Sequence, residues 1–261
     1  MNILDQIIAY KRSEVADQKL AVSIGALEKT DFFLRDTLSL KQFLLDKNRT
    51  GIIAEFKRRS PSKGILNEKS NVADVTAAYA KYGASGLSVL TDNNFFGGSN
   101  EDLVTARSNR IPILRKDFMI DEYQIVEAKS IGADTILLIA ACLTAIEVKQ
   151  LAQTAKKLQL EVLLEIHEES EIGHICEEID VIGVNNRNLK TFSVDLDQSV
   201  RLAEKIGTSK LKIAESGISN LKNIAYLKRY GFDGFLIGEY FMKQNDPAEA
   251  FEKFVNELKE V

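Results

Sequence analysis

Cysteine and histidine are scarce in this sequence, with two of each among 261 residues. Cys142 and Cys176 lie in apolar surroundings and are too few for a disulfide framework, so we expect reduced thiols in a cytoplasmic protein. His167 and His174 lack the spacing of metal ligands, and no cluster of cysteines and histidines accompanies them. We therefore expect no metal site, and we place both histidines at the surface or behind the residues that contact a ligand.

Long runs of one charge or of apolar residues are also missing. The formal net charge is -4 and no extended basic segment occurs, which gives no reason to expect a nucleic-acid partner. No charge-free stretch is long enough to span a membrane, and residues 1–20 mix charged with apolar side chains, unlike a secretory signal. With 45% hydrophobic and 28% charged residues, the composition suits a globular protein with one large core.

Short apolar runs rich in Ile, Val and Leu alternate with longer segments of helical spacing beyond residue 50. Such runs are typical of strands buried on both faces, and the intervening helices make neighbouring strands parallel. They predict an α/β fold, a single (β/α)8 TIM barrel. A doubly wound open sheet is the alternative, but it usually has fewer strands and a glycine-rich phosphate loop after the first one, where this chain has Glu55-Phe56-Lys57. The runs are Gly51–Phe56, Gly86–Leu90, Pro112–Arg115, Thr135–Ala140, Val162–Ile166, Val181–Val184, Leu211–Ala214 and Gly234–Ile237.

The N-terminal part of the chain has no strand-like run. It has helical patterns at Leu4–Lys19 and Ser39–Asp46 instead. Residues 1–50 are too few to bury much core alone, so we expect a helical N-terminal extension packed on a barrel of residues 51–261, with one structural domain overall.

Charged residues follow several of the apolar runs. Glu55 and Lys57 lie two apart and therefore on one face of the first strand, Lys116 ends the third, Glu165 the fifth and Glu215 the seventh. Barrel active sites lie at the carboxyl ends of the strands. A rim of structural ion pairs could explain any one of these charges, but five converging charges favour an enzyme that acts on a small anionic substrate.

Two further segments fit the ends of a ligand pocket. Ser216-Gly217 and Gly238-Glu239 follow the seventh and eighth strands, where barrels commonly bind phosphate, although each glycine could equally serve a turn or a helix cap. Phe96 and Phe118 lie beside strand-end charges and could wall an apolar pocket. Gly97-Gly98 predicts a mobile loop over Asn93–Ser99.

Five motifs together resemble a known family, the indole-3-glycerol phosphate synthases. The resemblance implies ring closure, with loss of carbon dioxide and water, of 1-(2-carboxyphenylamino)-1-deoxyribulose 5-phosphate in tryptophan biosynthesis. It also implies that no cofactor and no metal are needed. The motifs are Ile53–Gly64, with Ser-Pro-Ser-Lys-Gly at its end, Leu87–Asp92, Leu114–Phe118, Ile182–Leu189 and Ala214–Ile218.

The resemblance also implies roles for individual residues. Lys116 matches the general acid of the condensation and Glu165 the acid/base of the dehydration. Lys57 takes part in proton transfer or holds the substrate carboxylate, and which lysine acts at which step is left open. Glu55 orients and tunes the lysines, whose pKa we expect burial or a neighbouring like charge to lower toward neutrality. Asn185 and Glu215 complete the catalytic set, Ser60, Arg187, Ser216, Gly217, Gly238 and Glu239 match substrate or phosphate contacts, and Phe96, Phe118 and Leu137 match the aromatic pocket.

The chain departs from the family pattern in two places. The segment Ile65–Asn71 lacks the arginine and proline of the family's loop, which bears on loop closure and phosphate affinity. Glu239 stands where some members have serine, and because its carboxylate would repel phosphate, we assign only its backbone N–H to binding.

Two other functions remain open on the same barrel. A Schiff-base aldolase or sugar-phosphate isomerase also uses lysines at strand ends, and a non-enzymatic ligand-binding barrel could keep the same pocket. In each case the partner is a small phosphorylated molecule, and we expect a monomer with no nucleic-acid or membrane partner.

Overall fold

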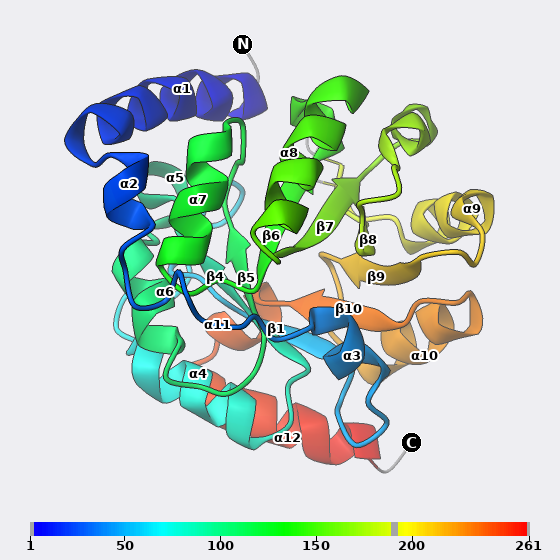
Figure 1. Cartoon of the computed structure of the whole chain (residues 1–261). Helices are drawn as coiled ribbons and strands as arrows, with labels where there is room; N and C mark the ends of the chain where they lie inside the picture. The colour runs from blue at the N-terminus through cyan, green and yellow to red at the C-terminus, as the bar shows by residue number, and fades with distance from the viewer. Residues whose placement is uncertain (1–2, 189–192, 260–261) are drawn as a thin grey trace.

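The computed structural model describes residues 3–188 and 193–259. Eight parallel strands form a closed barrel in the order β1-β10-β9-β8-β7-β6-β5-β4, and β1 pairs with both β4 and β10 (Figure 1). The predicted barrel is confirmed, and the open-sheet alternative is wrong. The strands coincide with the predicted runs to within two residues: β1 (Ile52–Phe56), β4 (Gly86–Leu90), β5 (Ile113–Lys116), β6 (Thr135–Ile139), β7 (Glu161–Ile166), β8 (Val181–Asn185), β9 (Leu211–Glu215) and β10 (Gly234–Ile237).

Helices follow the strands and cover the barrel from outside. Their inward faces and the outward faces of the strands share one large apolar cluster, which explains why most strand positions are apolar on both faces. Among the described helices, none is both long and apolar enough to cross a membrane. The helices between and after the strands are α4 (Val72–Lys81), α6 (Asn100–Ala106), α7 (Glu122–Ser130), α8 (Ala145–Lys157), α9 (Leu196–Ile206), α10 (Leu221–Arg229), α11 (Glu239–Met242) and α12 (Pro247–Lys259), with short 3-10 helices η1 (Ala140–Cys142) and η2 (Glu169–His174).

The helix α3 (Leu40–Leu45) closes the amino-terminal end of the barrel. Leu40 and Leu44, one helical turn apart, join the inward-facing side chains of the strands in a second apolar cluster. Glycines at the starts of two strands make room for them, because a Cβ on Gly86 would lie 2.7 Å from Leu40 Cδ1 and one on Gly234 would lie 2.6 Å from Leu44 Cδ2. The opposite end, where the strands finish, stays open to a ligand.

The helix α1 (Ile3–Ala21) crosses the amino-terminal end of α7, at the end of the barrel where the strands finish (Figure 1). Val15 of α1 packs with Tyr123 and Val126 of α7. A short helix that the sequence did not predict, α2 (Ile24–Leu27), follows α1.

The segment after β4 differs from the prediction. Asn93–Phe96 forms a helical turn, α5, rather than part of a mobile loop. The Asp92 carboxylate accepts the backbone N–H groups of Phe95 and Phe96, and Gly97 ends the turn in the left-handed region at φ 66°. Gly97 therefore ends the helical turn, and Gly98 permits a close contact with the backbone of Leu90. The turn fixes Phe96 beside the strand ends.

Candidate active site

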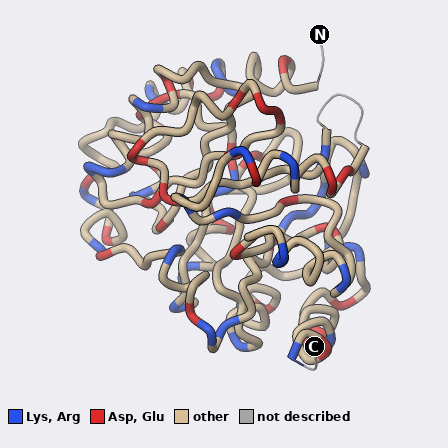
Figure 2. Tube along the Cα trace, turned by 90° about the vertical axis from the view of Figure 1, so that its right-hand side faces the viewer, with Lys and Arg blue, Asp and Glu red and all other residues tan. Residues whose placement is uncertain are grey.

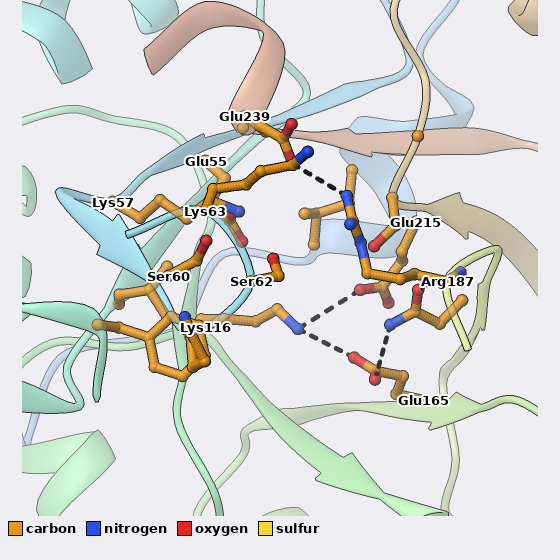
Figure 3. Close-up of a pocket in the computed structure, with 18 of the residues that line it drawn as sticks. Glu55, Lys57, Ser60, Ser62, Lys63, Lys116, Glu165, Arg187, Glu215 and Glu239 are labelled. Carbon is orange, nitrogen blue, oxygen red and sulfur yellow. Dashed lines mark hydrogen bonds and ion pairs between the residues drawn. The ribbon is translucent and has the colours of Figure 1, made fainter. Parts of the chain in front are cut away.

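A cavity of about 530 Å³ lies at the carboxyl ends of the strands. Every candidate site residue named from the sequence lines it, and Figure 3 shows the charged ones pointing toward one another across the cavity. These residues are Glu55, Lys57, Ser60, Phe96, Lys116, Phe118, Leu137, Glu165, Asn185, Arg187, Glu215, Ser216, Gly217, Gly238 and Glu239.

Lys116 lies between two carboxyl groups from other strands. It is the last residue of β5, and its Nζ lies 2.9 Å from Glu165 Oε2 of β7 and 3.5 Å from Glu215 Oε2 of β9 (Figure 3). Asn185, at the end of β8, donates from Nδ2 to Glu165 Oε1 at 3.0 Å. The barrel thus joins side chains that are distant in sequence into one hydrogen-bonded group.

The carboxylates decide the protonation state of Lys116. Burial alone lowers the pKa of this ammonium, but Glu165, Glu215 and Glu55 together outweigh burial and raise the pKa above its ordinary value. The expectation of a lysine pKa lowered toward neutrality is therefore wrong for Lys116. It carries its proton throughout the physiological range.

Glu165 and Glu215 have opposite protonation states at neutral pH. Burial raises the pKa of Glu165, but Lys116, His167 and a hydrogen bond from Asn185 hold it well below the usual range, so this group is ionised. For Glu215, burial comes first, the nearby carboxylates add to it, and Lys116 only partly opposes them, so the pKa rises to about 8. Of these two carboxyl groups, Glu215 therefore carries the proton at neutral pH, and it lies within reach of Lys116.

A second lysine–carboxylate pair comes from β1 and the turn after it. Lys57 Nζ lies 2.6 Å from Glu55 Oε1, and Ser88 donates to Glu55 Oε2 at 3.5 Å. A Cβ on Gly238 would lie 2.4 Å from Glu55 Oε1, so only glycine at that position leaves room for the carboxylate.

The phosphate end predicted from the sequence has a constrained backbone. Ser216 and Gly217 both have positive φ, 68° and 70°. A side chain on Gly217 would collide with Val194, and Asn186 holds the turn by donating to the Ser216 carbonyl at 2.7 Å. Because serine rarely adopts this conformation, the strain is maintained by its surroundings, as is common at binding sites.

Arg187 and Glu239 form an ion pair at the same end of the cavity. Arg187 Nη2 lies 2.9 Å from Glu239 Oε2. A carboxylate and a phosphate bind a guanidinium in the same way, so Glu239 competes with any anionic ligand for Arg187.

Aromatic and aliphatic side chains line the rest of the cavity. The ring centroids of Phe96 and Phe118 lie 6.1 Å apart, and Leu137 also lines this part. The sequence analysis missed other lining residues: Ser62 and Lys63, which lie inside the quoted first motif, Lys243, and Ile3, Leu4 and Ile7 of α1. The apolar spacing of the α1 residues was the only signal for them, and it marks a buried face without saying what the face covers.

The segment Ile65–Asn71 is held by side-chain amides rather than by arginine. Gly64–Ile65 (β3) pairs with Arg59–Ser60 (β2) in a small antiparallel sheet, which the sequence analysis also missed. Asn67 accepts from the backbone of Lys69 and Ser70 and donates to the Gln244 carbonyl at 3.2 Å. This amide ties the segment to the end of α11.

The two histidines lie outside the cavity lining. His167 is buried next to Glu165, and the His174 ring nitrogens lie 3.1 Å and 3.0 Å from the carbonyl oxygens of Glu171 and Leu143. Within residues 3–188 and 193–259, no group of three or more His, Cys, Asp or Glu side chains is arranged to hold a metal ion.

Comparisons with known proteins agree with this architecture. Solved structures from Pyrococcus furiosus share the fold at low identity: a tryptophan synthase complex (TM-score 0.60, 14% identity, 80% of this chain and 98% of that one) and thiamine phosphate pyrophosphorylase (0.59, 18%, 84% and 99%). A relative from Bacteroides thetaiotaomicron named indole-3-glycerol phosphate synthase is 47% identical over 98% of this chain and 99% of its own, and one of the same name from Acinetobacter baylyi is 40% identical over 95% and 94%. The family model for indole-3-glycerol phosphate synthase matches residues 4–254, and the chain belongs to that family.

Proposed function

We propose that this protein closes the indole ring of indole-3-glycerol phosphate, releasing carbon dioxide and water from 1-(2-carboxyphenylamino)-1-deoxyribulose 5-phosphate. The observation that carries the proposal is Lys116 held 2.9 Å from Glu165 and 3.5 Å from Glu215 in a cavity with an aromatic wall. Family membership supports the same reaction.

Lys116 acts on the carbonyl oxygen in the condensation. As the ring carbon attacks the carbonyl, negative charge develops on its oxygen, and a fixed ammonium in a buried site stabilises that charge and supplies a proton. Loss of carbon dioxide then restores the aromatic ring. Glu215, whose pKa is about 8, carries a proton close enough to Lys116 to restore the ammonium.

Lys57 and Glu165 serve the dehydration. The departing hydroxyl needs a proton, which Lys57 supplies while Glu55 orients it at 2.6 Å. The ionised Glu165 accepts the proton that the intermediate loses, because its low pKa keeps it free of a proton at neutral pH.

The remaining lining residues bind the two ends of the substrate. Phe96, Phe118 and Leu137 enclose the aromatic ring. The phosphate lies at the other end, bound by Arg187 and by backbone N–H groups. The Asn185 side chain orients the Arg187 backbone, because Asn185 Oδ1 accepts the Arg187 backbone N–H at 3.0 Å. The residues that provide this end are Ser60, Arg187, Ser216, Gly217, Gly238 and Glu239.

A turnover assay tests the proposal directly. Purified protein incubated with the anilino-ribulose phosphate should produce indole fluorescence, and a signal no higher than background refutes the proposed function. Lys116→Met and Glu165→Gln should each lower kcat by roughly 100-fold or more, with unchanged circular dichroism. The matched control is Lys253→Met, which removes an exposed lysine paired with Glu249 on α12 and should leave turnover unchanged.

The Schiff-base alternative makes a different prediction. It requires a neutral amine, which the carboxylates around Lys116 oppose. Borohydride with a ketose phosphate should therefore leave Lys116 and Lys57 unmodified. Tight substrate binding without turnover would instead support the non-enzymatic alternative.

We also propose that the chain is a cytoplasmic monomer in which residues 1–50 fold as one unit with the barrel. Burial of Leu40 and Leu44 in the barrel end supports the single unit, and burial that raises the pKa of the Cys142 thiol to about 12 fits a protein whose cysteines stay reduced. In Figure 2 basic and acidic residues are interspersed along the chain, which supports the proposal that the protein has no nucleic-acid partner. Light scattering after size-exclusion chromatography tests the monomer.

A further inference from the structure

One of the two histidines contacts the carboxylate at the centre of the site from behind. His167 follows β7 and is 8% exposed. Its Nε2 lies 3.2 Å from Glu165 Oε1, whereas Lys116 contacts the other oxygen, Oε2. On its far side, Nδ1 lies 3.8 Å from Glu171 Oε2 of η2, and the same oxygen accepts the His167 backbone N–H at 2.5 Å.

Two carboxylates flank the imidazole of His167 and favour its charged form. A neutral imidazole has one N–H and one lone pair, and a carboxylate only accepts hydrogen bonds. A protonated ring instead places a positive charge 3.2 Å from Glu165 and 3.8 Å from Glu171, which are ion-pair contacts without hydrogen-bond geometry. Burial lowers the pKa of His167, but the two carboxylates outweigh burial and raise the pKa to about 10, so the ring is a buried cation at neutral pH.

We propose that His167 is a positioning residue for the ring-closing reaction, whose imidazolium holds the Glu165 carboxylate against Lys116 and keeps it ionised for proton transfer. This inference rests on the proposed function. It extends the site to an alternating row of charges formed by Lys116, Glu165, His167 and Glu171.

The groups around Glu165 define what His167 contributes. Lys116 of β5 supplies the other cation, and Asn185 of β8 donates one hydrogen bond. Glu215 of β9 is mostly protonated at neutral pH, and the Cys142 thiol of η1 is neutral because burial raises its pKa to about 12. Removing His167 therefore removes one of two cations from Glu165 and leaves its pairing with Lys116 intact.

The pH dependence of turnover tests this role. In His167→Gln, the pKa of Glu165 should rise, and the acidic limb of kcat/KM against pH should move upward by about one pH unit. kcat should fall more than KM changes, because Glu165 acts on the reacting atoms. His167→Lys, which retains a positive charge, should return the limb toward that of the unsubstituted protein.

The second histidine provides the matched control. His174→Gln removes a ring that contacts only the carbonyl oxygens of Glu171 and Leu143 in hydrogen-bond range, so it should leave the acidic limb in place even where it lowers thermal stability. A limb that stays fixed in His167→Gln, or that moves equally in His174→Gln, overturns the proposal.

The charge of His167 can be measured without turnover. 15N NMR of the imidazole in the unsubstituted protein should show both ring nitrogens protonated at pH 7.5, and a neutral ring overturns the proposal. Absence of turnover in the unsubstituted protein would refute the proposed function alone, because the NMR result would still decide whether His167 is the cation described.

Discussion

Lys11 of α1 provides a test of how the N-terminal helix is held. The side chain is 2% exposed, and Nζ lies 3.0 Å from Asp92 Oδ2, 2.9 Å from Asp117 Oδ1 and 2.5 Å from Glu14 Oε2. Asp92 and Asp117 are themselves buried. Lys11→Met keeps most of the apolar stem but removes the cation that pairs with buried Asp92 and one of the two cations that pair with buried Asp117, which costs about 3–5 kcal/mol.

Thermal unfolding followed by circular dichroism measures this cost. A loss of that size should lower Tm by roughly 6–20 °C, at about 2–4 °C per kcal/mol. Lys253→Met removes a lysine from an exposed ion pair and should leave Tm almost unchanged. Equal Tm values for Lys11→Met and the unsubstituted protein would refute the reasoning, as would equal losses in the two lysine variants.

A double variant separates lost charge from lost packing. Asp92→Asn keeps the oxygen that caps α5 and removes the charge that faces Lys11. Added to Lys11→Met, it should recover part of the lost Tm, because the buried charge that Lys11 had compensated at position 92 is gone. The KM of Lys11→Met should also rise, since Ile3, Leu4 and Ile7 of the same helix line the cavity.

Other positions give predictions of different kinds. Glu215→Gln should alter the pH dependence of stability. Because the pKa of Glu215 is raised to about 8, this group contributes stability that is fully present below its usual pKa and is lost as the pH rises to 8. The Tm of the unsubstituted protein should therefore fall relative to that of the variant between pH 5 and pH 8. Glu239→Ser should lower the substrate KM by several-fold in steady-state kinetics, because it frees Arg187 for phosphate, and an unchanged KM would count against a phosphate at this end. Gly238→Ala should lower kcat/KM by about 10-fold or more, because its Cβ would displace the Glu55 carboxylate, and full activity would show that Glu55 can move without harm.

The sequence predicted the strands well because a strand that is buried on both faces appears as a nearly continuous apolar run. Runs such as Thr135–Ile139 are buried at every position and apolar after the first, and a parallel barrel is where such strands are stable. Side-chain alternation also predicted Glu55 and Lys57 on one face, and the 2.6 Å contact between them agrees with it.

The sequence has no comparable signal for which side chains on different strands contact one another. The sequence placed Lys116, Glu165 and Glu215 at strand ends but did not show that both carboxyl groups contact Lys116, and the direction of the Lys116 pKa shift depends on those contacts. Lys11 likewise resembles an ordinary charged residue on a helix, since only the fold shows that it faces buried Asp92 and Asp117. The roles of the site residues, and the division at residue 50, stay predictions.

Closure of the sheet through β1 and β10 has a consequence for biosynthesis. Residues Ile52–Ala54 of β1 pair with β10, which ends at Ile237. One edge of β1 therefore has no partner strand until most of the polypeptide has left the ribosome. Exposed strand borders recruit other chains. Substitutions that weaken the last strand should therefore reduce the yield of native protein during expression before they alter any rate constant of the molecules that fold.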